Sequence, residues 1–236
     1  EIALIGRELN EGTYGIGILT DQTDLKDGLA YDLQIKAQDQ ALNETVATVA
    51  TNVRFDITKP TFSEVFPVAS SRINTQTLRW TVDEKLKSGK YTWIHMGGDP
   101  DPNAPHELAL PEDLLGAGQN NNTKLQPLNL ILNAMYRITL EGTDLAGNTG
   151  KKFIMSVVYD NVPPVLKLSY PESNTAVNHL DIAYALDEQL ENAQIIYTRV
   201  GGDPDPNSPV AVELQGSELE SSFETQNTTS TLPVLN

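Results

Sequence analysis

An internal repeat constrains this chain more than any other feature of its sequence. The segment Gly97–Asn103 recurs without change as Gly201–Asn207, 104 positions later (201 − 97 = 104). Four other anchors keep the same spacing: Asp83-Glu84 with Asp187-Glu188, Leu86 with Leu190, Phe66-Pro67 with Tyr170-Pro171, and Asp56 with Asp160. Chance does not place five separated matches at one offset, and self-similarity at a fixed period indicates a repeat architecture.

A second register links the start of the chain to its middle at an offset of 105 (136 − 31 = 105). It places Tyr31, Leu33, Ile35, Ala37, Asp39, Ala41 and Asn43 on Tyr136, Ile138, Leu140, Gly142, Asp144, Ala146 and Asn148. Together the two registers predict three segments. Residues 1–59 form the late-strand part of a first repeat, 60–163 a complete repeat, and 164–236 the early-strand part of a third.

Within the complete repeat, apolar and polar residues alternate, as they do along a half-buried strand. Leu78, Trp80 and Val82 share one face, and Ile182, Tyr184 and Leu186 repeat the pattern in the next copy. Further strands are predicted over 90–96, 106–110, 124–132, 136–143 and 153–160, with turns at 87–89, 118–120 and 147–150. The chain is therefore predicted to be all-β, with Greek-key β-sandwich repeats of about 104 residues.

The segment from Tyr136 to Asn148, followed by Asp160 and then by Asn-Val-Pro-Pro, resembles the immunoglobulin-like repeats of large bacterial surface proteins and adhesins. The resemblance covers essentially the whole chain. It implies tandem immunoglobulin-like modules at the cell surface, or outside the cell, of a prokaryote, in a stalk that in some families is adhesive or stiffened by calcium. The first copy departs from the pattern, because Asp39–Asn43 lacks the glycine and leaves the form of its turn open.

Composition narrows the classes of function. Acidic residues outnumber basic ones 32 to 16, for a net charge of −16, and a phosphate backbone would repel such a surface. We therefore expect no nucleic-acid partner. No apolar run is long enough for a membrane helix, so we expect no membrane insertion in this segment. The absence of cysteine rules out disulfides, thiolate metal sites and cysteine nucleophiles.

Several acidic and amide side chains stand at turns and at repeat boundaries, where oxygen ligands for calcium could gather. The candidate ligands are Asp56 and Asp160 before the boundaries, Asp144 and Asn148 around a tight hairpin, and Asp99, Asp101, Asp203 and Asp205 in the two Gly-Asp-Pro loops. Each set also has a plain structural interpretation: a stiff proline linker, a turn whose short side chains bond to backbone amides, and a rigid acidic loop. No cofactor other than calcium is suggested.

No catalytic constellation is present. His95, His106 and His179 lack metal-ligand spacing, and no nucleophile or phosphate-binding motif occurs. Asp83 and Glu84 are adjacent and would point to opposite faces of a strand, so they would not share a site. Tyr31 and Tyr136, at strand starts, are instead expected to bond to nearby backbone, as in a tyrosine corner.

We therefore expect a non-enzymatic structural and interaction protein. Its modules would form a stalk, fibre or filament, and its partners would be neighbouring copies of the repeat or of the chain. The split terminal repeats have two interpretations. The residues are a window cut from a longer repetitive protein, or the terminal pieces of neighbouring chains complete one another head to tail, because open strand edges invite pairing. The alternative is an adhesive module of a larger surface protein or secreted enzyme that binds a cell-surface carbohydrate or protein. For this, Trp93 with Tyr91 is the candidate aromatic pair.

Overall fold

The computed structural model describes residues 24–121, 127–179, 181–222 and 227–228. The chain divides into two compact units, Glu1–Asn161 and Val162–Asn236. The predicted segments 1–59 and 60–163 thus fall almost entirely in the first unit, and residues 1–23 lie outside the described part. All regular structure in the described residues is strand, apart from two short 3-10 turns, η3 (Glu112–Leu114) and η4 (Gly216–Leu219). None of the described residues forms a helix of the length and apolarity that crossing a membrane requires.

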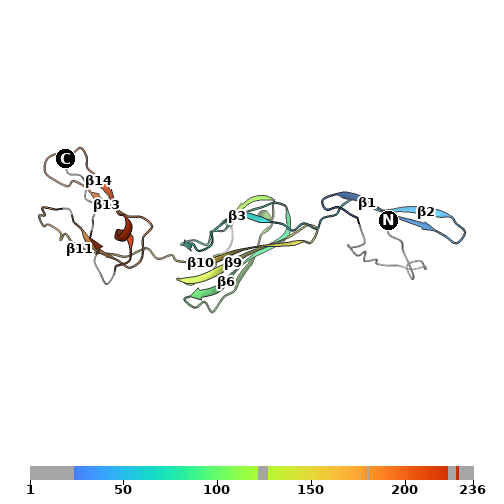
Figure 1. Cartoon of the computed structure of the whole chain (residues 1–236), viewed down its shortest axis with the longest axis horizontal. Coiled ribbons are helices and arrows are strands. Elements are labelled where there is room, and N and C mark those ends of the chain that lie inside the picture. Colours follow the sequence, from blue (N-terminus) through green and yellow to red (C-terminus); the bar gives the residue numbers. More distant parts are fainter. Residues whose placement is uncertain (1–23, 122–126, 180, 223–226, 229–236) are drawn as a thin grey trace. The chain divides into compact units, whose positions relative to one another are not determined.

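The described part of the first unit begins with a hairpin and continues into two sheets. In the hairpin, β1 (Ala30–Gln38) pairs antiparallel with β2 (Glu44–Arg54). The remaining strands are β3 (Phe62–Phe66), β4 (Arg72–Ile73), β5 (Arg79–Val82), β6 (Leu86–Gly98), β7 (His106–Ala109), β8 (Gly118–Asn121), β9 (Ala134–Asp144) and β10 (Thr149–Tyr159). One sheet has the order β4-β10-β9-β6-β7 and the other β3-β5-β8. Figure 1 shows β6, β9 and β10 side by side in one layer, with β3 in the other.

A single apolar core joins these two sheets. Trp80 and Val82 on β5 are buried, as are Trp93 on β6 and Tyr136 on β9. All four belong to one cluster of core residues. The rings of Trp93 and Tyr136 meet edge to face with centroids 5.7 Å apart, an arrangement that aromatic pairs prefer. Two sheets that share one core between them are consistent with a β-sandwich.

The second unit contains β11 (Leu166–Tyr170), β12 (Ala183–Leu186), β13 (Gln194–Tyr197), β14 (Val210–Glu213) and β15 (Asn227–Thr228). The bounds of β11, β12 and β14 lie 104 positions after those of β3, β5 and β7, so alternation at the same positions produces the same strands. Among its described residues the cluster of buried core residues is smaller and contains Tyr184, Leu186 and Leu214. Tyr184 stands 104 positions after Trp80, and Leu186 after Val82.

Hydrogen bonds recur at the same offset as the strands. The N–H of Leu86 donates to the carbonyl of Leu115 over 2.8 Å, and the N–H of Leu190 donates to that of Leu219 over 2.8 Å. The N–H of Asp83 donates to the carbonyl of Thr61 at 3.3 Å, and the N–H of Asp187 donates to that of Val165 at 3.3 Å. The N–H of Leu110 donates to the carbonyl of Gly89 at 2.8 Å, and the N–H of Leu214 donates to that of Ala193 at 2.9 Å.

Three local predictions were wrong. Residues 87–89 form no turn, because they lie inside β6, where Gly89 pairs with Gly142 of β9. Residues 118–120 form no turn either, since their backbone pairs with β5 and completes the smaller sheet. The predicted strand over 124–132 is absent from 127–132, which is irregular, and 124–126 lie outside the described residues. In the first two cases pairing with a distant strand overrode the local propensity of Gly, Ser and Asn for turns. In the third, the N–H and carbonyl of Leu128 both bond to the Gln76 side-chain amide and not to a neighbouring strand.

Candidate functional site

The hairpin between β9 and β10 positions one buried carboxylate. Asp144 Oδ1 accepts hydrogen bonds from the N–H groups of Gly147 at 2.6 Å and Asn148 at 2.8 Å. The Asn148 side-chain amide donates to Asp144 Oδ2 at 2.9 Å. Gly147 has a φ of +102°, in the region that favours glycine. Asp144 and Asn148 therefore make the turn that short polar side chains next to a glycine predict.

The segment that leads out of β2 packs against this hairpin. The Asn148 side-chain amide also donates to the main-chain carbonyl of Asp56 over 3.0 Å. Two residues further on, a Cβ on Gly150 would lie 1.8 Å from the carbonyl oxygen of Pro60, so only glycine fits beneath this segment. The linker 56–60 is therefore held to the β9–β10 hairpin by a hydrogen bond and by close packing.

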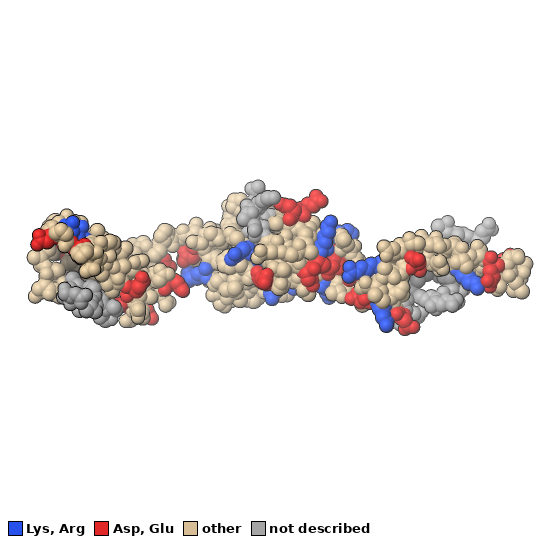
Figure 2. Space-filling model, turned by 90° about the horizontal axis from the view of Figure 1, so that it is seen from above, with Lys and Arg blue, Asp and Glu red and all other residues tan. Residues whose placement is uncertain are grey.

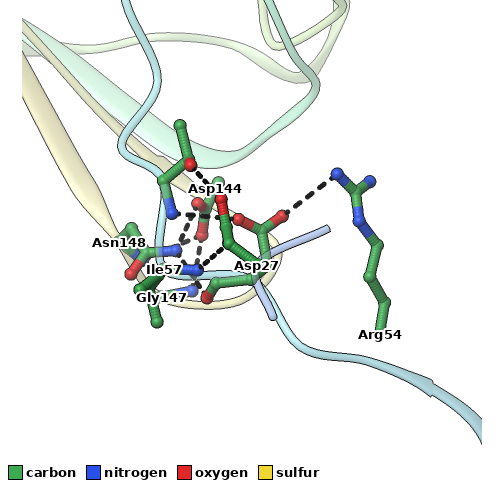
Figure 3. A network of polar contacts seen from close by, with 8 residues as sticks. Asp27, Arg54, Ile57, Asp144, Gly147 and Asn148 are labelled. Atoms are coloured by element: carbon green, nitrogen blue, oxygen red, sulfur yellow. Dashed lines mark hydrogen bonds and ion pairs between the residues drawn. The ribbon is translucent and has the colours of Figure 1, made fainter. Parts of the chain in front are cut away.

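Asp27 fixes the same linker from the side of the β1–β2 hairpin. Its Oδ1 accepts the N–H of Ile57 over 2.8 Å, and its Oδ2 accepts the hydroxyl of Thr58. These bonds hold the pKa of Asp27 below its ordinary value, the Thr58 hydroxyl having the largest effect. Arg54 forms an ion pair with Asp56 at 3.7 Å. Figure 3 shows the resulting network, in which Asp27 and the Asp144–Asn148 turn lie beside Ile57 of the linker.

Three carboxylates meet at this point, and we call Asp56, Glu84 and Asp144 the junction cluster. One oxygen from each lies within 4.8 Å of the other two. Oxygen ligands at 2.3–2.6 Å from a shared calcium ion lie at most about 5 Å apart, so the spacing fits a hard divalent cation. Calcium takes six to eight oxygens, so carbonyls or waters would have to supply the others.

The ionisation of the cluster reflects crowding of like charge. The pKa of Glu84 is raised, first by burial and then by the negative charges of Asp144 and Asp56. Burial alone would also raise the pKa of Asp144, but the bonds from the side chain and N–H of Asn148 bring it below its ordinary value. Without a cation, the repulsion between these carboxylates therefore acts mainly against the ionisation of Glu84.

The other predicted calcium ligands are not brought into such a group within the described residues. Asp160 pairs with the Arg72 guanidinium at 3.0 Å. Asp101 is buried and bonded to Tyr136 and His106. Asp99, Asp203 and Asp205 are exposed, and Asp205 Oδ1 accepts the N–H of Asn207 at 2.9 Å, which closes its own loop.

Glu84 is the residue of the cluster that the sequence analysis missed. The expectation that Asp83 and Glu84 point to opposite faces of a strand does not apply, because both lie in the bend after β5. Asp83 accepts the N–H of Thr61 at 2.8 Å and its hydroxyl at 2.6 Å. Glu84 instead meets carboxylates from other parts of the chain. The recurrence of this acidic pair as Asp187-Glu188 was the signal that could have singled it out.

Both predicted corner tyrosines bond to the backbone five residues upstream, as expected. The Tyr31 hydroxyl accepts the N–H of Lys26 at 2.8 Å, and the Tyr136 hydroxyl accepts the N–H of Ile131 at 2.9 Å. Tyr136 also donates to Asp101, and its pKa is raised above its ordinary range, chiefly by burial.

The candidate aromatic pair for a carbohydrate surface is buried. Trp93 is fully shielded from solvent and Tyr91 is 2% exposed. A sugar ring cannot stack on either side chain while the core is intact. On the face that Figure 2 shows, acidic and basic side chains are scattered among the other residues.

No protein-family model matches this sequence, and a search of curated proteins finds no significant match.

Proposed function

We propose that the chain is part of a non-enzymatic structural protein, in which immunoglobulin-like β-sandwich modules of about 104 residues follow one another in series outside the cell of a prokaryote. The observation that carries the proposal is the recurrence of strands and hydrogen bonds at one offset, as in Leu86–Leu115 and Leu190–Leu219. Repetition of a whole folding unit suits a protein whose task is to span distance, because each unit adds length and buries its own core.

The way the middle module holds its ends together favours a load-bearing role. β4, near its start, pairs in parallel with β10, at its end. The N–H of Val158 donates to Ser71 O at 3.0 Å, and the N–H of Asp160 donates to Ile73 O at 2.8 Å. Tension applied to the two ends of a parallel pair pulls the strands past each other and loads these bonds together rather than one by one.

The contacts of the linker support a stiff connection between the β1–β2 hairpin and the module that follows. Asp27, Asn148 and Gly150 fix residues 56–60 by hydrogen bonds and close packing. We include in the proposal that calcium binds the junction cluster and cancels its like-charge repulsion. Asp56, Glu84 and Asp144 would supply its protein carboxylates.

Single-molecule pulling on the chain, held at both ends, tests the load-bearing role. The middle module should unfold in one event that releases about 30 nm, given roughly 100 residues at 3.3–3.6 Å each. Val158→Pro removes one donor of the parallel pair and should lower the unfolding force. Lys152→Ala, on an exposed position of the same strand, serves as the matched control. Gradual extension without a discrete event would refute the proposal.

A further inference from the structure

The β1–β2 hairpin exposes an apolar face that its counterpart in the middle module buries. Leu33 and Ile35 on β1 are 42% and 43% exposed, and Val49 on β2 is 60% exposed. At the offset of 105 these residues correspond to Ile138, Leu140 and Ile154, which are 0%, 0% and 3% exposed. In the middle module that face is covered by the sheet β3-β5-β8, which contributes Trp80 and Val82 to the shared core.

Among the open strand edges in the described part of the chain are those of β1 and β13, and the counterparts of these two strands pair with each other. β1 pairs with β2 and β13 pairs with β14, and neither has a second partner among the described residues. β9 corresponds to β1, and the stretch of β6 from Lys90 to Trp93 corresponds to β13. β6 and β9 are adjacent and antiparallel, with Tyr91 opposite Leu140 and Trp93 opposite Ile138.

Transferring this register to the open edges of β1 and β13 places apolar residues opposite apolar residues on the inner face. Ile195 would lie opposite Ile35, and Tyr197 opposite Leu33, with their apolar side chains on the inner face. On the outer face, Gln194 would lie opposite Lys36 and Ile196 opposite Gln34. Ile195 packs against the core of the second unit, and Tyr197 is partly buried.

We propose that the β1–β2 hairpin of one chain docks on the Val162–Asn236 unit of a second copy, with β1 added antiparallel to β13 and with Leu33, Ile35 and Val49 inserted into that unit's core. This rests on the proposed function, since it assumes that both pieces belong to one repeating fold. When a strand is added to a sheet edge, main-chain hydrogen bonds give affinity, and pockets that take alternate side chains give specificity. The two contact surfaces differ, so the contact is heterologous and builds an open chain of subunits.

Cysteine pairs test the register directly, because the chain has no cysteine of its own. Opposed residues of an antiparallel pair have Cα atoms about 4.5–5.5 Å apart, within disulfide reach. The double variant Gln34→Cys/Ile196→Cys should form, under mild oxidation, a reducible ladder of dimers, trimers and longer species on a denaturing gel. Gln34→Cys/Ile195→Cys is the mismatched control, because successive side chains of a strand point to opposite faces.

The equivalent pair in the middle module, Thr92→Cys/Thr139→Cys, separates the inference from the proposed function. These residues are opposed within one chain and should give an oxidised monomer. If this bond forms while Gln34→Cys/Ile196→Cys gives only monomers, whether reduced or closed on themselves, the docking is refuted and the proposed function stands. If the Thr92 and Thr139 pair also fails, the shared register and the proposed function both fall.

Two further variants, each added to Gln34→Cys/Ile196→Cys, test the apolar face. Leu33→Asp should reduce the ladder about tenfold, since an unpaired carboxylate would enter a core. Val46→Asp is the matched control, because Val46 is exposed and corresponds to the exposed Lys151 on the outer face. If both variants reduce the ladder equally, or if neither reduces it, docking through this face is contradicted.

Discussion

The hydroxyl of Tyr136 lies 2.6 Å from Oδ2 of Asp101, and the phenol donates to a carboxylate that is shielded from solvent. Nε2 of His106 reaches the same oxygen at 2.6 Å. This contact ties the Gly-Asp-Pro loop after β6 to the start of β9. The aspartate that the sequence presented as a candidate calcium ligand thus serves as an anchor within the module, and its bonds to protein groups replace water.

Removing the phenol should destabilise the middle module. In Tyr136→Phe the buried Asp101 carboxylate and the Ile131 amide each lose a partner, at a cost of about 1–3 kcal/mol. Urea unfolding followed by tryptophan fluorescence measures this, because Trp80 and Trp93 are the chain's two tryptophans and both lie in this core. Tyr31→Phe, which removes an exposed bond outside that core, should leave the transition unchanged. An unchanged transition in Tyr136→Phe would contradict the anchoring role.

The stability of the module should fall in acid partly through Asp101. Burial raises the pKa of this carboxyl, but the bonds from Tyr136 and His106 outweigh burial and leave the pKa below its ordinary value. A carboxyl whose folded-state pKa is depressed stabilises the fold above its unfolded pKa of about 4 and loses that contribution as the pH falls through the folded value. Asp101→Asn should therefore flatten the dependence of the free energy of unfolding on pH below about 4. An unchanged slope would contradict this assignment.

Glu84 should affect the pH dependence of stability in the opposite direction to Asp101. Its pKa is raised, so its folded-state penalty grows as the pH rises through that value. With chelator present at neutral pH, Glu84→Gln should increase the free energy of unfolding by about 0.3–1 kcal/mol, allowing for screening at this half-buried site. Added calcium should raise the melting temperature of the natural chain and raise that of Glu84→Gln much less. An equal calcium response in both proteins would exclude the junction cluster as the binding site.

The turn of the first hairpin repeats that of the middle module, although it lacks the glycine. Asp39 Oδ1 accepts the N–H of Asn43 at 2.8 Å, as Asp144 Oδ1 does that of Asn148 at 2.8 Å. Leu42 holds a φ of +71° where the second turn has Gly147. An L-residue in this region costs about 1–2 kcal/mol.

Leu42→Gly should therefore stabilise the β1–β2 hairpin by about 1 kcal/mol. Little is lost in burial, because Leu42 is 73% exposed. Slower amide hydrogen exchange at Asn43 and along the hairpin measures the gain. Leu42→Ala keeps the strained backbone and serves as the control, which should show no comparable slowing. Equal slowing in both variants would mean that strain at this position is not the cause.

Local patterns predicted the parts of the fold that local chemistry decides. Alternation gave the face of β5 that carries Trp80 and Val82, and the turn residues gave the hairpin at Asp144. The edges of the sheets were not predictable in the same way. Gly118–Asn121 has the composition of a turn, yet its backbone completes a sheet with β5. The partner of such a strand is more than thirty positions away in the chain, and no local pattern encodes it.

The residues of the candidate site likewise divide into those that local sequence features indicate and those that distant segments bring together. Asp56, Asp144 and Asn148 were found because they stand at a boundary and at a turn, two features that are visible in the sequence. Glu84 was missed because its role depends on three distant segments of the chain that meet at one point. Asp101 was predicted to be a candidate ligand because the sequence of its loop does not indicate that Tyr136 and His106 bond to its carboxylate and bury it.

The most direct test of the account joins its two half-modules in one polypeptide. At the two offsets, residue 236 corresponds to 132 and residue 28 to 133, so 162–236 followed by 28–59 reads as one continuous module. We predict that this fusion unfolds in a single cooperative transition with fixed aromatic packing in near-ultraviolet circular dichroism, and that Leu33→Asp abolishes the transition. A fusion that remains without a cooperative transition would contradict the claim that the two ends of the chain are parts of one repeating fold.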